Sequence, residues 1–469
     1  MEVQQKKKKY DMSLGRRIGY GTGQFATNIF STAVGSFLTA YYTDSIMLAA
    51  AWVGVMMLVT RLLDGVSDLV MGAVIDKTYT KWGKARPWVA IVAIPFAISF
   101  ILMFNVPSSL TGGALKTYVV VTYILHTIIC GTIANVALNT LNVKVTEDGA
   151  TRASAISISN MFCNLAIFVG NTYTASIMMY FGGERRGYLG MSILYSVIAV
   201  ICLLICFFCG KEYRVETKEQ EQVRMEAAGI TRAKKGGTKE LLAALFGNRY
   251  VIPMAVAFAL NWLAISINGG GQVYYCRDVL GSMRYMGQLA MARSIPSIIF
   301  LAIGVMPIFI RMFGKKKGLI ICCAVQVIAH IVMWLAPLNP SALIAGNILK
   351  GCFQGLTGGL LFATVADVAD YVDLKNNVSL AGMTSSITSF GMKIGVGLGS
   401  ALIGWILAWG NYNPANIPTG MPPETIAAEK IIYIMVPAIC LIGVLLCSLF
   451  VDVDKKLPEL RAAHEDKKD

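Results

Sequence analysis

The chain alternates long apolar runs with short polar segments along its whole length. A run of roughly 20 apolar residues can cross the hydrocarbon core of a bilayer as a helix. The runs at 251–275 and 342–366 are diluted by glycine and polar residues, but both are long enough. We therefore expect an all-α polytopic membrane protein with twelve transmembrane helices: 18–42, 46–74, 88–107, 117–143, 154–181, 188–209, 251–275, 286–310, 318–337, 342–366, 379–409 and 430–451.

One polar segment, 210–250, is much longer than the other interior ones and divides the runs into six and six. A faint internal repeat supports this division, because "WGKAR" (82–86) follows the second run and "FGKKK" (313–317) follows the eighth. Many secondary transporters consist of two repeated halves with the substrate site between them. The expected organisation is an N-terminal six-helix half, a cytoplasmic linker, a C-terminal six-helix half and a cytoplasmic tail: 1–209, 210–250, 251–452 and 453–469.

Composition and charge support this class and set an orientation. The 469 residues are 55% hydrophobic and 14% charged, whereas soluble domains average about 25% charged residues. The net charge of +14 could suggest a nucleic-acid partner, but the basic clusters fall in alternate loops. Lys and Arg concentrate on the cytoplasmic side of membrane proteins. We therefore expect an inner-membrane protein with both termini in the cytoplasm and no nucleic-acid partner.

Several charged residues lie deep inside the runs: Arg61, Asp64, Asp68 and Lys393. A charge at the centre of a membrane helix costs about 2.5–3.5 kcal/mol, so these groups must face one another, water or a ligand. At about 100° per residue, Arg61, Asp64 and Asp68 share one stripe of a helix. Two such carboxylates repel unless a proton or a small cation lies between them. Ser67 would add an oxygen ligand that suits a hard cation such as sodium. The alternative is a static ion pair of Arg61 with one aspartate.

Other polar and small residues in the runs are less specific. Four asparagines could hydrogen-bond a polyhydroxylated substrate or could join helices to one another: Asn28, Asn135, Asn139 and Asn160. Gly391, Gly395 and Gly399 recur at four-residue spacing around "KIGVGLGSALIG". Because no strand precedes them, they predict close helix packing and not nucleotide binding. The eleven cysteines are mostly single and the three histidines are far apart. We expect the cysteines to pack as small apolar residues, and no metal site beyond that for a coupling cation.

A specific family pattern covers residues 41–88. The segment "YYTDSIMLAAAWVGVMMLVTRLLDGVSDLVMGAVIDKTYTKWGKARPW" resembles the signature of the glycoside–pentoside–hexuronide:cation symporters, the melibiose permease group of the major facilitator superfamily. Further matching segments follow in order over essentially the whole chain: "GYGTGQFATN" (19–28), "NVALNTL" (135–141), "GGERRGY" (182–188), "ADVADY" (366–371) and "SFGMKIG" (389–395). The resemblance implies the major facilitator fold and cation-coupled sugar uptake by alternating access.

The resemblance also implies roles for individual residues. Asp64 and Asp68 would bind sodium, lithium or a proton, with Ser67 and Thr132 assisting. Lys393 would lie close to both the sugar and the cation. Substrate-binding positions would be Asn28, Thr27, Asn135, Asn139, Asn160, Lys393 and Ser389. The "DKTYTKWGKAR" segment resembles the cytoplasmic loop that latches the two halves in the outward-facing state. A gating and charge network would comprise Arg61, Asp76, Lys84, Arg86, Asp367 and Asp370.

The sugar positions depart from the melibiose-type pattern. Asn28 and Asn135 stand where that pattern has carboxylates, Asn139 where it has a stacking tryptophan, and Asn160 where it has an arginine. Asparagine at the first two positions is similar to the glucuronide and pentoside branches. The substrate therefore stays open among glycosides, pentosides and hexuronides, and Lys393 could pair with the carboxylate of a hexuronide.

Other function classes fit the sequence less well. An integral membrane enzyme would need a nucleophile, a base or a metal cluster, and His126 and His330 have no clustered acid or cysteine partners in sequence. A channel or a non-transporting sensor could also contain buried charges, but the repeat and the loop motifs favour a carrier. We expect no enzyme activity, no cofactor, Na+ or H+ as the coupling ion, a small sugar as substrate, and a monomer. A sugar uniporter, or a substrate/product exchanger without cation coupling, is the alternative.

Overall fold

The computed structural model describes residues 12–146, 148–213, 215, 217, 219–220, 249–302, 305–376, 381–454, 456–457 and 459–460, so most of the linker lies outside the description. Within this part of the chain, nine helices are long and apolar enough to cross a membrane. Three further helices, α1, α2 and α11, cover the other predicted runs. The expected all-α polytopic architecture is confirmed, and the count of twelve spans stays a prediction.

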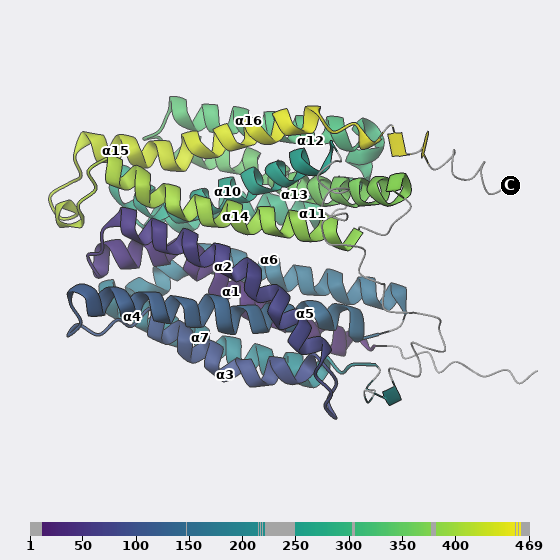
Figure 1. Ribbon diagram of the computed structural model, residues 1–469. Helices are drawn as coiled ribbons and strands as arrows, with labels where there is room; N and C mark the ends of the chain where they lie inside the picture. Colours follow the sequence, from purple (N-terminus) through teal and green to yellow (C-terminus); the bar gives the residue numbers. More distant parts are fainter. Residues whose placement is uncertain are drawn as a thin grey trace, which may run out of the picture. The chain divides into compact units, whose positions relative to one another are not determined.

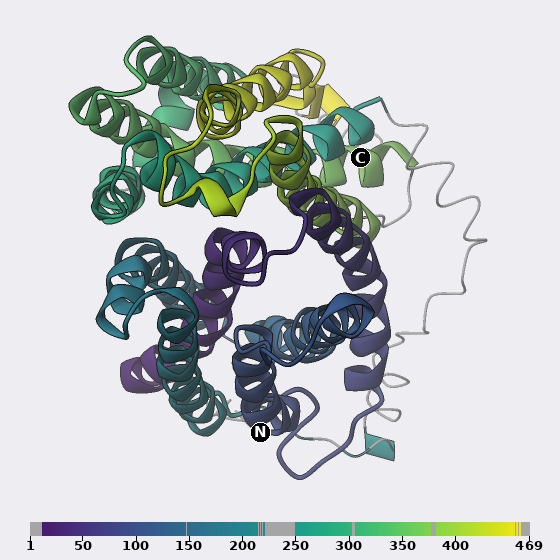
Figure 2. The same cartoon turned by 90° about the vertical axis from the view of Figure 1, so that its left-hand side faces the viewer.

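Contacts along the chain define two compact units. The first contains Met1–Val34, Leu63–Gly170 and Ser176–Arg232, and the second contains Gly35–Leu62, Asn171–Ala175 and Ala233–Asp469. The first unit includes about half of α2 and most of α6. Its other elements are α1 (Leu14–Ala33), α3 (Arg86–Met103), α4 (Gly112–Ile124), η3 (Leu125–Gly131), α5 (Thr132–Lys144) and α7 (Glu184–Cys209). In full, α2 is Ala50–Asp76 and α6 is Gly149–Tyr180. Figure 2 looks along the helices, which run roughly parallel to one another within each unit.

The second unit contains the remaining helices. It begins with the π-helical segments η1 (Val34–Leu38) and η2 (Tyr41–Ser45), which continue α1. Its other elements are α10 (Val251–Tyr274), η4 (Tyr275–Val279), α11 (Arg284–Ala302), α12 (Val305–Leu335), α13 (Pro340–Asn376), α14 (Ala381–Trp409), η5 (Pro414–Asn416), α15 (Pro423–Lys430), η6 (Ile431–Met435) and α16 (Val436–Leu449). The stretch α15–η6–α16 forms one nearly continuous rod, coloured yellow in Figure 1.

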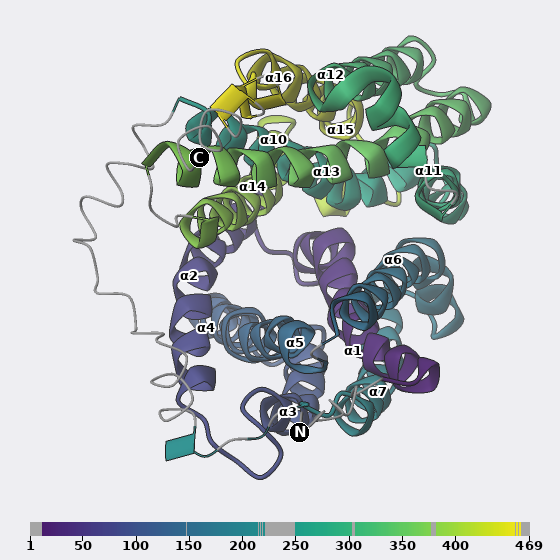
Figure 3. The ribbon, with the colours of Figure 1, turned by 90° about the vertical axis from the view of Figure 1, so that its right-hand side faces the viewer.

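In the first unit, α1 packs tightly against α7 and α5. A Cβ atom on Gly23 would lie 2.7 Å from the Sγ atom of Cys206, so only a glycine allows this approach. The Tyr20 hydroxyl donates a hydrogen bond of 2.5 Å to Asn142 Oδ1 of α5. Figure 3 shows that α1, α3, α5 and α7 are neighbours in one helix bundle. All eleven cysteines are free, and Cys206 packs as the small apolar residue that the sequence predicts.

In the second unit, α14 packs against α10 through its glycine stripe. Cβ atoms on Gly391 and Gly395 would lie 2.7 and 2.1 Å from the backbone oxygens of Ala255 and Ala259, and one on Gly399 would lie 2.8 Å from Ser266 Cβ. The prediction of close helix packing is confirmed. The start of α2 also packs against α14, since a Cβ on Gly404 would lie 2.2 Å from the backbone oxygen of Ala50. This contact explains why residues 35–62 group with the second unit.

Two predicted boundaries differ from the structure. The predicted loop around 311–317 narrows to one non-helical residue, Gly314, whose φ of 73° interrupts α12. Glycine adopts this left-handed conformation without steric strain. The last run also begins earlier than predicted, because α15 starts at Pro423.

Candidate functional site

The predicted cation site is centred on Asp64, in the middle of α2. Asp64 is 8% exposed, and its Oδ1 accepts a hydrogen bond of 3.0 Å from the Thr132 hydroxyl. The Ser67 hydroxyl lies 2.9 Å from the Thr132 hydroxyl and 2.9 Å from the backbone oxygen of Asp64, to which it donates. Three of the four predicted cation-binding residues therefore lie together in the first unit.

Thr132 owes its position to an irregular segment. It is the first residue of α5 and directly follows the seven-residue π-helical segment η3. A π-helical turn shifts the faces of the helix beyond it, and such turns are frequent at functional sites. The adjoining His126 is held by a 3.0 Å contact with the Ser99 hydroxyl and by stacking on Phe96. The packed aromatic cluster thus fixes the segment that presents Thr132 to Asp64.

Asp68 and the predicted sugar-binding asparagines lie in the same unit. Asp68 is half-buried on α2, one helical turn after Asp64. On α5, Thr132, Asn135 and Asn139 fall within roughly 60° of one another, and both asparagines are exposed. Asn160 on α6 is exposed as well. A polar face of α5 therefore continues from the hydroxyl that contacts Asp64.

Asn28 and Thr27 are bound within their own helix. Thr27 is 1% exposed, and Asn28 Nδ2 donates to the backbone oxygen of Gln24 at 2.8 Å and to Gln24 Oε1 at 3.2 Å. Gln24 was not among the predicted substrate positions. Its amide could take part in any polar site that Asn28 forms, because the two side chains are already hydrogen-bonded.

The remaining predicted substrate residues belong to the second unit. Lys393 is half-buried on α14, and Ser389 lies on the same helix with its side chain outside the described part. One turn after Lys393, a Cβ on Gly397 would lie 3.0 Å from Cβ of Arg61. Arg61 thus packs on the helix that carries Lys393. The position of Lys393 close to the sugar and the cation stays a prediction.

Comparisons with known proteins identify the family. The sequence profile of the family described as MFS/sugar transport protein matches residues 19–455. The chain belongs to this family. The inner membrane symporter YicJ of Escherichia coli (strain K12) is 28% identical over 436 residues, which cover 92% of this chain and 89% of YicJ. The isoprimeverose transporter of Lactiplantibacillus pentosus is 27% identical over 458 residues, which cover 96% and 91%. The resemblance to the glycoside–pentoside–hexuronide:cation symporters is thereby confirmed.

Solved structures agree on the fold. The crystal structure of a D-xylose-proton symporter superposes with a TM-score of 0.64 and covers 95% of this chain and 97% of its own, at 14% sequence identity. At this identity the likeness concerns the fold alone. This member of the sugar-transport family is therefore a multi-pass membrane protein with the major facilitator fold.

The loop that resembles a family latch is fastened within the first unit. Glu212, which follows α7 and is 7% exposed, accepts hydrogen bonds from the backbone N–H groups of Ala85 (2.7 Å) and Arg86 (3.1 Å). These are N–H groups at the start of α3, which lack partners inside the helix. Gly83 has a φ of 108°, and any Cβ there would overlap the Glu212 carboxylate. Glu212 was missed because it lies in the linker, where acidic residues are common.

The predicted network residues of this loop have short contacts. The Arg86 side chain donates from Nε to the backbone oxygen of Phe207 at 2.6 Å and lies 4.4 Å from the centre of the Phe207 ring. Lys84 donates to the backbone oxygen of the exposed Asp76 at 3.1 Å. The role of these residues in latching the two halves stays a prediction.

The other predicted network residues lie at the end of α13. Asp367 forms a salt bridge with Lys315, which follows the break at Gly314 in the "FGKKK" segment. Asp370 is exposed one turn later. The second copy of the repeat is therefore anchored by a carboxylate, as "WGKAR" is anchored by Glu212 in the first unit.

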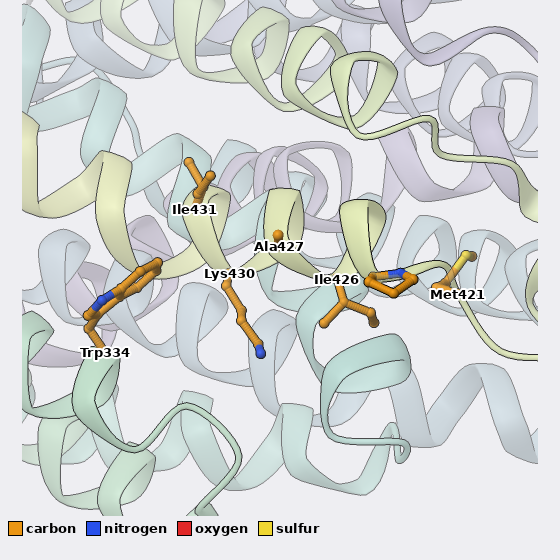
Figure 4. Close-up of a pocket in the computed structure, with 7 residues that line it drawn as sticks. Trp334, Met421, Ile426, Ala427, Lys430 and Ile431 are labelled. Atoms are coloured by element: carbon orange, nitrogen blue, oxygen red, sulfur yellow. The ribbon is translucent and has the colours of Figure 1, made fainter.

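Two cavities of the second unit contain none of the predicted residues. A surface hollow of about 390 Å³ is lined by Trp334 and by α15, with Lys430 directed toward it (Figure 4). A second, smaller cavity has several polar residues in its lining: Asn261, Asn268, Gln326, His330, Lys350 and Gln354. Lys350 is 4% exposed, and among the described residues its ammonium nitrogen has no hydrogen-bond partner. Sequence reasoning missed Lys350, although it lies inside an apolar run as Lys393 does.

Proposed function

We propose that this protein is a cation-coupled symporter that imports a glycoside, a pentoside or a hexuronide by alternating access. Membership of a sugar-transport family supports the class, and the named relatives include a symporter and an isoprimeverose transporter. The proposed location is the bacterial inner membrane, with both termini cytoplasmic. The protein would act as a monomer without a cofactor and without enzyme activity.

The observation that carries the proposal is the contact of Asp64 with Thr132 and Ser67. The group offers a carboxylate and two hydroxyl oxygens in a largely buried position, with Asp68 one turn away on α2. Hard cations such as sodium prefer ligands of this kind. A hydroxyl that now donates to Asp64 can rotate and offer its lone pairs to a cation instead. A proton shared by Asp64 and Asp68 would serve the same purpose.

Coupling follows from charge compensation. Without a cation, Asp64 and Asp68 are negative groups that attract the nearest positive side chain, and Lys393 and Arg61 are the proposed partners. A bound cation compensates one of the two negative charges, which weakens the attraction for Lys393 and frees it to contact the sugar. Each ligand then increases the affinity for the other by the same factor.

The sugar site is proposed on the α5 face that carries Asn135 and Asn139, with Asn28, Asn160 and Lys393 contributing. An asparagine amide both donates and accepts hydrogen bonds, which suits sugar hydroxyls. The same positions lack the carboxylates that would repel an anionic hexuronide.

Uptake into proteoliposomes tests the function. The purified protein would be given labelled glycosides, pentosides and hexuronides under a sodium gradient, a proton gradient or no gradient. Gradient-driven accumulation above equilibrium would support the symporter and would identify both cation and substrate. Equilibration or exchange without accumulation, for a substrate that is clearly transported, would favour the uniporter or exchanger instead.

A further inference from the structure

The second unit contains a largely buried charge network that includes none of the predicted cation-binding residues. Asp44, in η2, accepts hydrogen bonds from the hydroxyls of Thr43 and Tyr412, each at 2.6 Å, and pairs with Arg277. The Arg277 guanidinium also binds Asp278 through two hydrogen bonds of 2.7 and 2.6 Å and donates to the Tyr412 hydroxyl at 2.8 Å. One arginine thus serves two carboxylates.

A third carboxylate, that of Glu429, belongs to the same network. Glu429 lies on α15 with 0% exposure. Among the described residues, no hydrogen-bond donor reaches either of its side-chain oxygens. Its neighbour is Asp278, which belongs to η4, the segment that packs against α15. Both Asp278 and Glu429 can only accept hydrogen bonds when ionised, so one of them must be protonated for this contact to be favourable.

The charges of the surrounding groups locate the proton. The groups that face Glu429 are Asp44, Arg277 and Asp278, while Tyr412 and Tyr274 close the network with neutral hydroxyls. With all three carboxylates ionised, the network would carry two uncompensated negative charges away from water. A buried charge without a partner costs several kcal/mol and is normally relieved by protonation. Asp278 already accepts two hydrogen bonds from Arg277, so Glu429 is the group that gains most from a proton.

We propose that Glu429 and Asp278 form a proton-binding site, in which Glu429 is a neutral carboxylic acid that donates a hydrogen bond to the Asp278 carboxylate. The site is separate from Asp64 and Asp68 and does not depend on which cation drives transport. Its ligand is a single proton, exchanged with the aqueous phase.

The proton stabilises the contact between Asp44 and Arg277. If Glu429 loses it, two neighbouring carboxylates compete for Arg277 and draw the guanidinium away from Asp44. Residues 35–62, which include Asp44, precede α10 by some 200 residues but belong to the second unit. The salt bridge between Asp44 and Arg277 is one of the contacts that hold them there. A rise in pH should therefore loosen the end of the molecule at which η2, η4 and α15 meet.

Infrared spectroscopy tests for the proton directly. The full-length protein in lipid should have a carboxylic acid band that disappears as pH rises, and Glu429→Gln should lack this band. Glu424→Gln is the matched control, because Glu424 is exposed on the same helix and the charge change is identical. Asp64→Asn should retain the band, which separates this site from the coupling site. A band that persists unchanged in Glu429→Gln would overturn the proposal.

A measurement on the wild-type protein covers the case in which Glu429→Gln does not fold. A hydrophobic carbodiimide reacts with protonated carboxylic acids, so mass spectrometry at low pH should find its adduct on Glu429 and not on Glu424. Absence of an adduct on Glu429 at every pH would overturn the proposal.

Cys276 reports the proposed loosening. It is fully buried next to Arg277, and its labelling by a maleimide in detergent should become about tenfold faster at high pH, equivalent to about 1.4 kcal/mol. Glu429→Gln should abolish this pH dependence. An equal pH response of Cys276 in Glu429→Gln, after correction for thiol ionisation with an exposed reference thiol, would contradict the link to Arg277.

Discussion

Asp64 and Asp44 are both largely buried aspartates, and the groups that contact them differ. Asp64 accepts a hydrogen bond from the hydroxyl of Thr132, which in turn contacts the hydroxyl of Ser67. Asp44 also accepts from two hydroxyls, but it forms a salt bridge with Arg277 as well. The contacts of Asp64 in the first unit thus include hydroxyls that can reverse their hydrogen bonds, whereas those of Asp44 in the second unit include a fixed positive charge.

The difference teaches what each carboxylate can do. A hydroxyl can reverse its hydrogen bond and become a cation ligand, whereas a guanidinium can only donate. Under the proposed function, Asp64 exchanges such a hydroxyl contact for a transported ion. Asp44 cannot, because a cation would have to displace Arg277. We therefore propose ion binding for Asp64 and a structural role for Asp44, and the following substitutions test this contrast.

Asp64→Asn should have the largest effect. It keeps the shape and the hydrogen bond to Thr132 but removes the negative charge. Cation-driven uptake should fall by about 100-fold or more, equivalent to about 2.7 kcal/mol of lost cation affinity. The measurement is initial uptake in proteoliposomes at saturating sugar, with Glu424→Gln as control. Undiminished cation-driven uptake in Asp64→Asn would exclude Asp64 as an essential ligand.

Asp44→Asn should act on stability. Removal of one partner leaves Arg277 partly buried with a weaker neighbour, at a cost of about 2 kcal/mol after allowance for the 12–19% exposure of the two side chains. The apparent unfolding temperature in detergent should fall by about 2–4 °C. Asp452→Asn breaks a more exposed pair with Lys316, in which Asp452 is 46% exposed, and should cost less than about 1 kcal/mol. Equal shifts in the two variants would refute the structural role of Asp44.

Thr132→Val should affect cation binding without unfolding the site. Valine fills the same volume but has no oxygen, so cation affinity should weaken by about tenfold, or about 1.4 kcal/mol. Thr132→Ser keeps the hydroxyl and should stay close to wild type. The concentration of cation that gives half-maximal uptake measures the effect. A valine variant with wild-type affinity would remove Thr132 from the ligand set.

Tyr412→Phe should have the smallest effect. It deletes one hydroxyl that donates to Asp44 at 2.6 Å and accepts from Arg277 at 2.8 Å, while the salt bridge remains. The expected loss of stability is about 1 kcal/mol, measured by thermal unfolding. Tyr180→Phe, at a position that is 86% exposed, serves as control. A loss as large as that of Asp44→Asn would mean that Tyr412, and not Arg277, dominates the network.

Much of the fold could be predicted from the sequence, because a membrane helix must be apolar over its full length. The glycine stripe of α14 was also predictable, since four-residue spacing aligns small residues on one face. Helix ends were less certain. Gly314 alone separates two helical segments, and neither hydropathy nor loop length indicates that a single residue suffices.

The candidate site was partly predictable for a similar reason. Asp64 and Ser67 lie near each other on one helix, and the family resemblance linked Thr132 to them. Lys350 could have been found by the same rule as Lys393. Asp44, Arg277 and Glu429 could not, because they lie near the ends of apolar runs, where charged residues are ordinary. Only the folded chain brings positions 44, 277 and 429 together.

The contact of Gly395 with Ala259 limits how this protein can move. Where two helix backbones are in direct contact, no flexible side chains lie between them that could rearrange. We therefore expect α10 and α14 to move together as one rigid body. Lys393, half a turn from that contact, cannot follow a ligand by sliding its helix along α10. Lys393 can therefore respond to cation or sugar in two ways: by changing its own rotamer, or by moving together with α10 and α14 as one body.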